Sequence, residues 1–109
     1  MSLNVVFTHA AEHDLRELRN YIVKSFGKEV WQTTYNQIKK TISTLRRFPL
    51  TGHIPDEITT LNLTQFRQVL SGINRIIYEI RPETIYVHIV CDSRKDMKSL
   101  LSKRLLRTL

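Results

Sequence analysis

The side chains best suited to chemistry in this sequence are basic and aromatic, and they gather in its second half. The set comprises Arg67, Arg75, Tyr86, His88, Arg94 and Lys95. Such groups bind RNA phosphate, and an arginine–histidine set can also transfer protons and stabilise charge while a phosphodiester bond breaks. Without a metal, cleavage would use the 2′-hydroxyl of the RNA itself. These residue types therefore fit either a binding surface or a ribonuclease site.

For two of these residues, a structural role explains the residue type as well as a chemical role does. Arg67 is expected to lie opposite Glu79 on the neighbouring strand, which would make an ordinary cross-strand ion pair. His88 is expected to face Ile77, with no carboxylate to orient its ring. The sequence therefore favours a structural role for His88.

No signature of a metal or cofactor site is visible. The chain has no glycine-rich phosphate loop, no dinucleotide-binding fingerprint, no His-Glu-x-x-His and no Cys-x-x-Cys. Its single cysteine, Cys91, excludes an intrachain disulfide, and His53 has no partners at ligand spacing. We therefore expect no metal and no cofactor.

The hydrophobic pattern takes a period of two from Phe66 onward, which predicts strands at 66–71, 74–80 and 84–92. A three-residue turn at 72–74 sets Arg67 opposite Glu79, and a two-residue turn at 82–83 sets Ile76 opposite Ile89. In that register one face is apolar and carries Phe66, Leu70, Ile76, Tyr78, Ile80, Ile85, Val87, Ile89 and Cys91. The opposite face is mixed, which suits a surface that a partner covers. It carries Arg67, Val69, Arg75, Ile77, Glu79, Tyr86, His88, Val90 and Asp92.

Helices are predicted before and after these strands. A short strand at 4–8 leads to Thr8, which is expected to cap a helix that ends at Gly27, and a second helix runs from Lys28 toward Pro49. Apolar residues recur on both helices at spacings of three and four, so an antiparallel hairpin should pack on the apolar face of the sheet. Residues 49–65 are expected to form a loop, and a short basic helix should follow the last strand. The prediction is a single α+β domain over 1–109, in the order β-α-α-β-β-β.

The charge of the chain restricts its partners. Seventeen Lys and Arg against ten Asp and Glu give a net charge of +7, which suits nucleic acid, an anionic surface or an acidic protein. Six bases and one acid lie between Arg94 and Arg107. No apolar run approaches the length of a membrane span, and no signal peptide is visible, so we expect a cytoplasmic protein without a membrane partner.

Four local motifs, in order along the chain, resemble those of the RelE/ParE superfamily of toxins from type II toxin–antitoxin systems. They are AAEHDLRELRNYI, LRRFPLTGHIPDEI, RQVLSGINRIIYEI and TIYVHIVCDSRKD. The resemblance covers nearly the whole chain, and Arg67, Arg75, Tyr78, Arg94 and Asp96 fall on recurring family positions. Asn74 and Asp92 depart from the pattern. Asp92 stands where many ribonuclease members carry a histidine. The segment SKRLLRTL also lacks the tyrosine that such members keep near this end.

These departures favour the ParE, or plasmid stabilisation, branch. The resemblance then implies a non-enzymatic toxin that inhibits DNA gyrase and forms a hetero-oligomer with an acidic cognate antitoxin. The expected contacts with antitoxin or target are made by Arg67, Arg75, Tyr86, Arg94, Lys95 and Lys98. Two alternatives stay open. One is a RelE-type endoribonuclease that cuts mRNA in the ribosome through Arg67, Arg75, His88 and Arg94, and the other is a degenerate toxin that serves as an interaction module.

Overall fold

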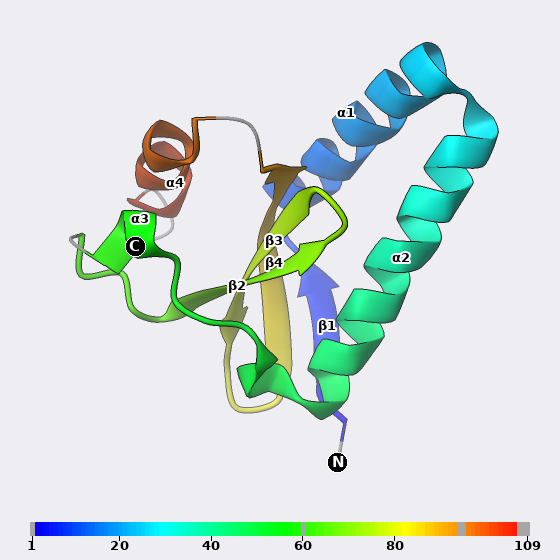
Figure 1. Cartoon of the computed structure of the whole chain (residues 1–109). Coiled ribbons are helices and arrows are strands. Elements are labelled where there is room, and N and C mark those ends of the chain that lie inside the picture. The colour runs from blue at the N-terminus through cyan, green and yellow to red at the C-terminus, as the bar shows by residue number, and fades with distance from the viewer. Residues whose placement is uncertain (1, 60, 94–95, 107–109) are drawn as a thin grey trace.

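The computed structural model describes residues 2–59, 61–93 and 96–106, with the exception of the side chain of Leu106. A four-stranded sheet carries helices on both faces (Figure 1). The elements are β1 (Asn4–Phe7), α1 (His9–Phe26), α2 (Lys28–Arg47), the 3₁₀ turn η1 (Pro49–Thr51), α3 (Asp56–Thr59), β2 (Phe66–Ser71), β3 (Asn74–Ile80), β4 (Thr84–Asp92) and α4 (Met97–Leu106). The predicted α+β class, the helical hairpin, the three later strands and the C-terminal helix are confirmed.

The sheet has the order β1-β4-β3-β2. β1 is parallel to β4, whereas the other neighbours are antiparallel. Figure 1 shows α1 and α2 on one side of this sheet and α3 and α4 on the other. Among the described residues, no helix is long and apolar enough to cross a membrane.

The helical hairpin forms where its capping residues predict. The Oγ1 atom of Thr8 accepts a hydrogen bond from the Ala11 N–H at 3.1 Å, which caps α1. Gly27 has φ of +99°, a value that glycine adopts without strain, and it alone separates α1 from α2. Ala11 and Ile22, which belong to the predicted apolar stripe of α1, are buried. Phe26, at the end of the same stripe, is 61% exposed.

The register of the strands differs from the prediction at two places. The turn between β2 and β3 has two residues, so Arg67 pairs with Tyr78 and not with Glu79. A β-bulge then interrupts the pairing of β3 with β4, because Tyr78 pairs with Val87 whereas Ile77 pairs with Ile89. His88 is the extra residue, and Ile76 consequently pairs with Val90, not with Ile89.

These shifts change the face on which several side chains lie. Phe66, Ile89 and Cys91 were expected under the hairpin, yet they pack with Ile77 and the apolar residues of α3 and α4. Val69 and Val90 make the opposite exchange and pack toward the hairpin. Leu70, also expected in the core, is 59% exposed.

The sheet therefore separates two hydrophobic cores, and the expectation of a mixed face awaiting a partner was wrong. The hairpin side buries Ala11, Ile38, Leu45, Ile76, Tyr78, Ile85, Val87 and Val90. The other side buries Ile58, Leu63, Phe66, Ile77, Ile89, Cys91, Met97, Leu101 and Leu105. The chain covers this second core with its own α3 and α4. The predicted loop at 49–65 thus contains η1 and α3, the second of which is part of that cover.

Candidate functional site

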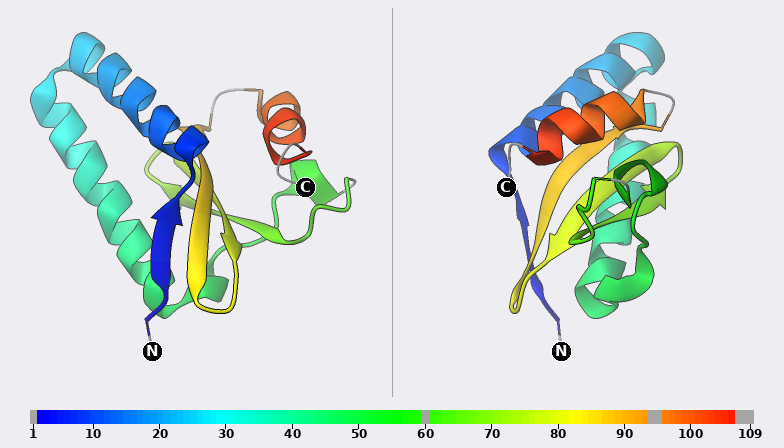
Figure 2. Two further views of the ribbon diagram at one scale, coloured as in Figure 1. Left: turned by 180° about the vertical axis from the view of Figure 1, so that it is seen from behind. Right: turned by 90° about the vertical axis from the view of Figure 1, so that its left-hand side faces the viewer.

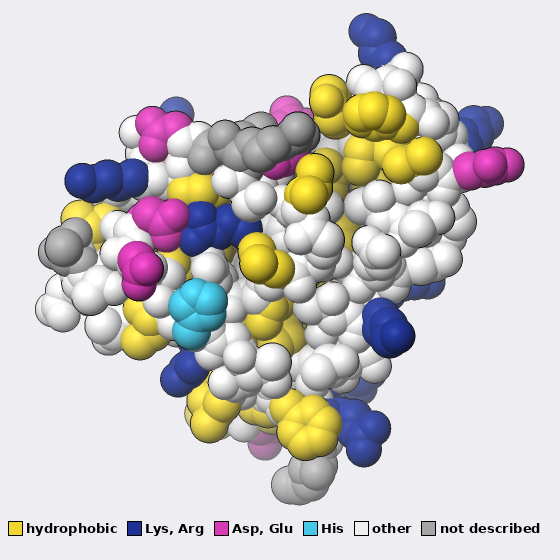
Figure 3. Space-filling view, in the orientation of Figure 1, with side chains coloured by type: hydrophobic (Ala, Val, Ile, Leu, Met, Phe, Trp, Pro, Cys, Tyr) yellow, Lys and Arg dark blue, Asp and Glu magenta, His cyan; other side chains and the backbone are white. Residues whose placement is uncertain are grey.

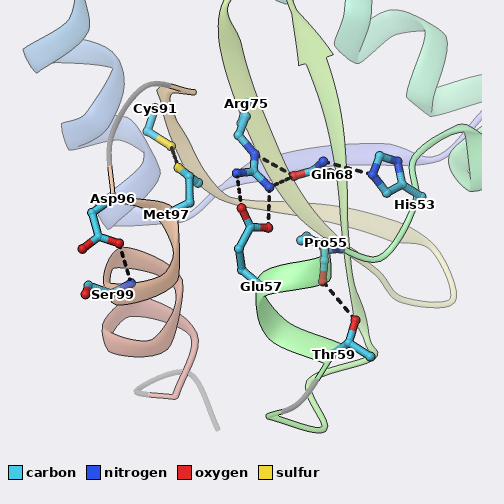
Figure 4. Close-up of polar contacts among 10 residues, drawn as sticks. All are labelled: His53, Pro55, Glu57, Thr59, Gln68, Arg75, Cys91, Asp96, Met97 and Ser99. Carbon is cyan, nitrogen blue, oxygen red and sulfur yellow. Dashed lines mark hydrogen bonds and ion pairs between the residues drawn. The ribbon is translucent and has the colours of Figure 1, made fainter.

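Arg75 lies at the centre of a polar cluster in which Arg75 and Gln68 are buried, Glu57 is half-buried and His53 is exposed (Figure 4). Its guanidinium donates to both carboxylate oxygens of Glu57, at 2.8 and 2.9 Å, and its Nε donates to Oε1 of Gln68 at 2.7 Å. Gln68 in turn contacts Nε2 of His53 at 3.0 Å. Arg75 is only 7% exposed. Its contacts join β3 to α3 and to β2, and Gln68 continues the cluster to the loop that carries His53. This arginine is occupied within the fold.

The ion pair affects the titration of both groups. The hydrogen bond from Arg75 lowers the pKa of Glu57 below its usual 4.5, and it outweighs the opposing effect of burial. The same bond raises the pKa of Arg75. Because the folded carboxyl has the lower pKa, the pair stabilises the fold fully above about pH 4.5, and this stabilisation is lost as the pH falls through the folded pKa.

Arg67 and Tyr78 hold the loop around Gly52. Arg67 donates from Nη1 to the Gly52 carbonyl at 2.7 Å. The Tyr78 hydroxyl accepts from the Gly52 N–H at 2.9 Å and donates to the Pro49 carbonyl at 2.7 Å. Burial raises the pKa of Tyr78 above 10.0, so the hydroxyl keeps its proton for this bond. Both family positions identified in the sequence thus stabilise one turn.

His88 has the carboxylate partner that the sequence analysis did not find. Its Nε2 lies 3.0 Å from Oε1 of Glu79, and its ring packs edge-on against Phe66 with 5.2 Å between the ring centroids. His88 is 8% exposed. Glu79 also accepts from Arg81 at 3.3 Å, and the Arg81 guanidinium lies 5.2 Å from the ring centroid of Tyr86. Both residues were expected on the same face of the sheet, but His88 was placed opposite Ile77. In the structure His88 is the extra residue of the bulge, so it has no directly paired residue on β3, and its ring contacts Glu79.

The predicted site residues do not converge on one open surface. Arg67, Arg75 and His88 contact different parts of the fold, whereas Lys98 is exposed on α4. Arg94 and Lys95 lie outside the described residues. Asp96 accepts from the Ser99 N–H at 3.3 Å and so serves the start of α4. Within the described part of the chain, no group of three or more metal-ligating side chains is present.

A groove along the helical hairpin is the feature that the sequence analysis missed. It has a volume of about 760 Å³ where α1, α2 and β1 meet, and it continues into a hollow of about 380 Å³ toward the hairpin tip. We call this continuous surface the hairpin groove. It is lined by Asn4, Val5, Phe7, Glu12, Leu15, Arg16, Arg19, Trp31, Tyr35, Ile38, Lys39, Ile42, Ser43 and Arg46.

The hairpin groove combines an apolar floor with a basic border. Trp31 and Tyr35 stack with their ring centroids 5.4 Å apart, and the Lys39 ammonium lies 5.0 Å from the Tyr35 ring centroid. Lys39, Arg16, Arg19 and Arg46 contribute four positive charges, against one negative charge from Glu12. The sequence did hold a signal, because Trp31 and Tyr35 lie on the apolar side of α2, which was expected to pack on the sheet.

The tip of the hairpin adds exposed apolar area beyond the groove. Tyr21 is 52% exposed, Phe26 61% and Val30 44%, and the first two rings meet edge-on at 6.1 Å. Figure 3 shows hydrophobic side chains gathered over this upper part of the hairpin, with Lys and Arg side chains around it. Such an apolar area, bordered by charge, is typical of a protein-binding surface.

A second polar cluster ties α4 to α1 and β4. The Arg104 guanidinium donates to both carboxylate oxygens of Asp14, at 3.0 and 3.1 Å, and to the His88 carbonyl at 2.9 Å. Asp14 also accepts from the Val90 N–H at 3.1 Å. The two side chains therefore satisfy backbone groups that lie beside the bulge. Asp14 and Arg104 are 90 positions apart, so local pattern gave no indication of this contact.

Comparison with known proteins gives a consistent result. The model of the family described as "ParE toxin of type II toxin-antitoxin system, parDE" matches residues 5–97. No curated protein matches significantly. Among solved structures, the chain is similar to one from the chromosomal ParDE system of P. aeruginosa, with 13% identity and a TM-score of 0.68, over 84% of this chain and 96% of that one.

Two further structures share the fold. One comes from the toxin–antitoxin complex RelBE2 of Mycobacterium tuberculosis, with 22% identity and a TM-score of 0.57, over 84% of this chain and 99% of that one. The other is a mutant of the E. coli toxin RelE in the free state, with 16% identity and a TM-score of 0.67, over the whole of both chains.

Proposed function

The chain belongs to the ParE toxin family of type II toxin–antitoxin systems, and we propose that it inhibits DNA gyrase until an acidic cognate antitoxin binds it. In this proposal the protein is a binder without catalytic activity, and the toxin–antitoxin pair serves plasmid stabilisation. The similar structure from P. aeruginosa comes from a ParDE system, which supports an antitoxin partner for this chain.

The observation that carries the proposal is that side chains of the predicted ribonuclease site already make hydrogen bonds within the fold. The Arg75 guanidinium donates hydrogen bonds to Glu57 and Gln68, and Nη1 of Arg67 donates to the Gly52 carbonyl. A phosphate would have to displace the half-buried Glu57 carboxylate from its bidentate pair with the buried Arg75 guanidinium. His88 is also buried, against Phe66 and Glu79. This arrangement favours a protein that acts through its surface.

The second candidate is a RelE-type endoribonuclease that cuts mRNA in the ribosome. The specific observation in its favour is the His88–Glu79 pair, since a carboxylate that orients an imidazole is a common acid–base arrangement. A degenerate toxin that serves only as an interaction module is the third candidate, and the exposed apolar hairpin tip is compatible with it.

Two assays on the purified chain distinguish these three functions. We expect it to block supercoiling of relaxed plasmid by gyrase, or to trap gyrase with cleaved DNA, while primer extension on translated mRNA shows no new ends. New mRNA ends with unimpaired supercoiling would establish the ribonuclease instead. No effect in either assay would exclude both toxic activities and leave the interaction module.

The hairpin groove is the surface on which we expect the antitoxin to bind. Its apolar floor and basic border are complementary to an acidic amphipathic segment. Of the residues first expected to make this contact, Arg67 and Arg75 are held within the fold. The exposed Lys98, and Tyr86 beside Arg81, remain candidates for contact with antitoxin or target.

Adjacent lysines on α2 provide a matched test of this surface. Lys39 lies in the hairpin groove and Lys40 does not, and both are exposed. We expect Lys39→Glu to weaken binding of the antitoxin encoded by the neighbouring reading frame about five- to tenfold, chiefly through slower association, as is usual for a border charge. Lys40→Glu should change the affinity less than twofold. Surface plasmon resonance at two salt concentrations measures both effects, and equal losses in the two variants would contradict the assignment.

A further inference from the structure

The outer side of α2 carries a cluster of positive charge. Four bases lie in the last three turns of this helix, at positions 39, 40, 46 and 47, whereas its one acid, Glu29, lies in the first turn. All four bases are exposed, and within the described part of the chain none of them makes an ion pair with a carboxylate. Arg75 and Arg104, by contrast, each bind a carboxylate within the fold. The charge on α2 is therefore available to an external anion.

The spacing of the side chains arranges this cluster in three rows along the helix, each made of two residues seven positions apart. Seven positions are almost two full turns, so the members of a row lie nearly above one another. The rows are Lys39 with Arg46, Lys40 with Arg47, and, between these two, Asn36 with Ser43. We call these six residues, all of them exposed, the basic face of α2. It has a row of cations along each side and neutral hydrogen-bonding side chains along its middle.

Contacts within the chain position two of these cations without neutralising them. Nε of Arg46 donates to the Leu3 carbonyl at 3.0 Å, and the Arg47 guanidinium lies 5.8 Å from the ring centroid of Phe48. A side chain that is already held loses less entropy when it binds a ligand. The helix dipole favours the two arginines, which lie in the last turn of α2, but it does not explain the two lysines that lie two turns earlier.

The side chains of the basic face distinguish among the anions that it could bind. An anionic membrane requires apolar side chains on the binding face of a helix, and a single-stranded nucleic acid requires aromatic rings on which its bases stack. The six residues include neither kind. Double-stranded DNA uses cations for its phosphates, and amide or hydroxyl groups for its base edges. The major groove of B-DNA, about 12 Å wide, also admits an α-helix. The three rows match this ligand.

We propose that the basic face of α2 binds double-stranded DNA, with the helix in the major groove. The two rows of cations contact the phosphates of the two strands, and the middle row faces the base edges. Asn36 accepts a hydrogen bond from Gln32 at 3.2 Å, so its amide nitrogen is the group that donates to the DNA. In Figure 1 and in the left view of Figure 2, α2 forms the outer edge of the molecule, where a duplex can reach it. The proposal concerns DNA alone and does not rest on inhibition of gyrase.

The affinity of the purified chain for a short DNA duplex, measured by fluorescence anisotropy at several salt concentrations, tests the proposal. Four phosphate contacts should give a slope of about −3.6 when the logarithm of the association constant is plotted against that of the salt concentration. Lys40→Gln removes one contact outside the hairpin groove. It should weaken binding about five- to tenfold near physiological salt and make the slope shallower by about 0.9. A slope near zero would overturn the proposal.

Lys103→Gln is the matched control, because it removes one exposed charge from α4 and changes the net charge equally. It should change the affinity less than twofold, and circular dichroism verifies that both variants fold. Equal losses in the two variants would overturn the proposal, since the DNA would then respond only to net charge.

An RNA duplex of the same sequence tests the position in the major groove. It should bind at least about fivefold more weakly, because the major groove of RNA is too deep and narrow for side chains to read. RNA that binds as tightly as DNA would contradict a helix in the major groove.

Discussion

Gly52→Ala is expected to lower the free energy of unfolding by about 3 kcal/mol, through overpacking and the loss of hydrogen bonds. A methyl group on Gly52 would overlap the Tyr78 hydroxyl and would lie 2.5 Å from the Gln68 carbonyl oxygen. The hydroxyl makes two hydrogen bonds in the same place, with the Gly52 N–H and the Pro49 carbonyl. The methyl group therefore forces the loop away from Tyr78. Equilibrium unfolding in urea, followed by circular dichroism, measures the loss.

A double-mutant cycle with Tyr78→Phe shows whether this overlap is the cause. Tyr78→Phe alone should cost about 1–2 kcal/mol, since it removes two buried hydrogen bonds. In the double variant the overlap with the hydroxyl is gone while the short distance to the Gln68 carbonyl oxygen remains, so the combined loss should fall short of the sum by about 1 kcal/mol. Strictly additive losses would mean that Gly52 is required for some other reason than its contact with Tyr78.

Asp14→Ala is expected to destabilise the fold by about 3 kcal/mol, in the lower part of the range for breaking a largely buried ion pair. The side chains of Asp14 and Arg104 are 13% and 19% exposed. Loss of the carboxylate leaves the Val90 N–H without its acceptor and removes the bidentate carboxylate contact of the Arg104 guanidinium. Alanine is itself a good helix former, so the loss does not come from α1.

The matched control for this prediction is Glu17→Ala, one turn further along the same helix and exposed. It should change the free energy of unfolding by less than about 0.5 kcal/mol. Hydrogen exchange locates the damage, because Asp14→Ala should speed exchange at the Val90 amide and along α4, but not in α2. Equal stability of the two variants would show that the contact between α1 and α4 contributes little.

The elements of the fold were predictable from sequence because their signals are local. The alternation from Phe66 onward predicted the bounds of β2, β3 and β4 as the structure has them. Thr8 and Gly27 marked the ends of α1 through their capping chemistry. α3 was missed because four residues are too few to show a helical period.

The register could not be predicted with the same certainty. Two- and three-residue turns after Ser71 both leave alternating apolar residues on each face. Adjacent branched residues, Ile76 with Ile77 and Ile89 with Val90, fit either face, and both pairs are buried in the structure. The bulge adds a single residue, His88, without any sequence mark of its own. For that reason the exchange of faces between Ile89 and Val90 was not expected.

The candidate site was predicted less well than the fold, for a related reason. Arginines at 67 and 75 were identified by residue type and family position, but residue type does not reveal whether a guanidinium is already paired. Glu57, which pairs with Arg75, lies in a segment expected to be an irregular loop. The hairpin groove lies where α1, α2 and β1 meet, so it depends on tertiary contacts that no local pattern contains.

The parallel pairing of β1 with β4 has a consequence for how this toxin is made. Asn4 pairs with Thr84, and Asp14 binds Arg104, so β1 and one side of α1 find these partners only in residues 84–104. Contacts so distant in sequence form late, because a long loop must close before they contribute. A growing chain therefore lacks the pairing of β1 with β4, and the contact of α1 with α4, until residues 84–104 have been synthesised. Any activity that needs the complete sheet therefore begins only after these residues have left the ribosome.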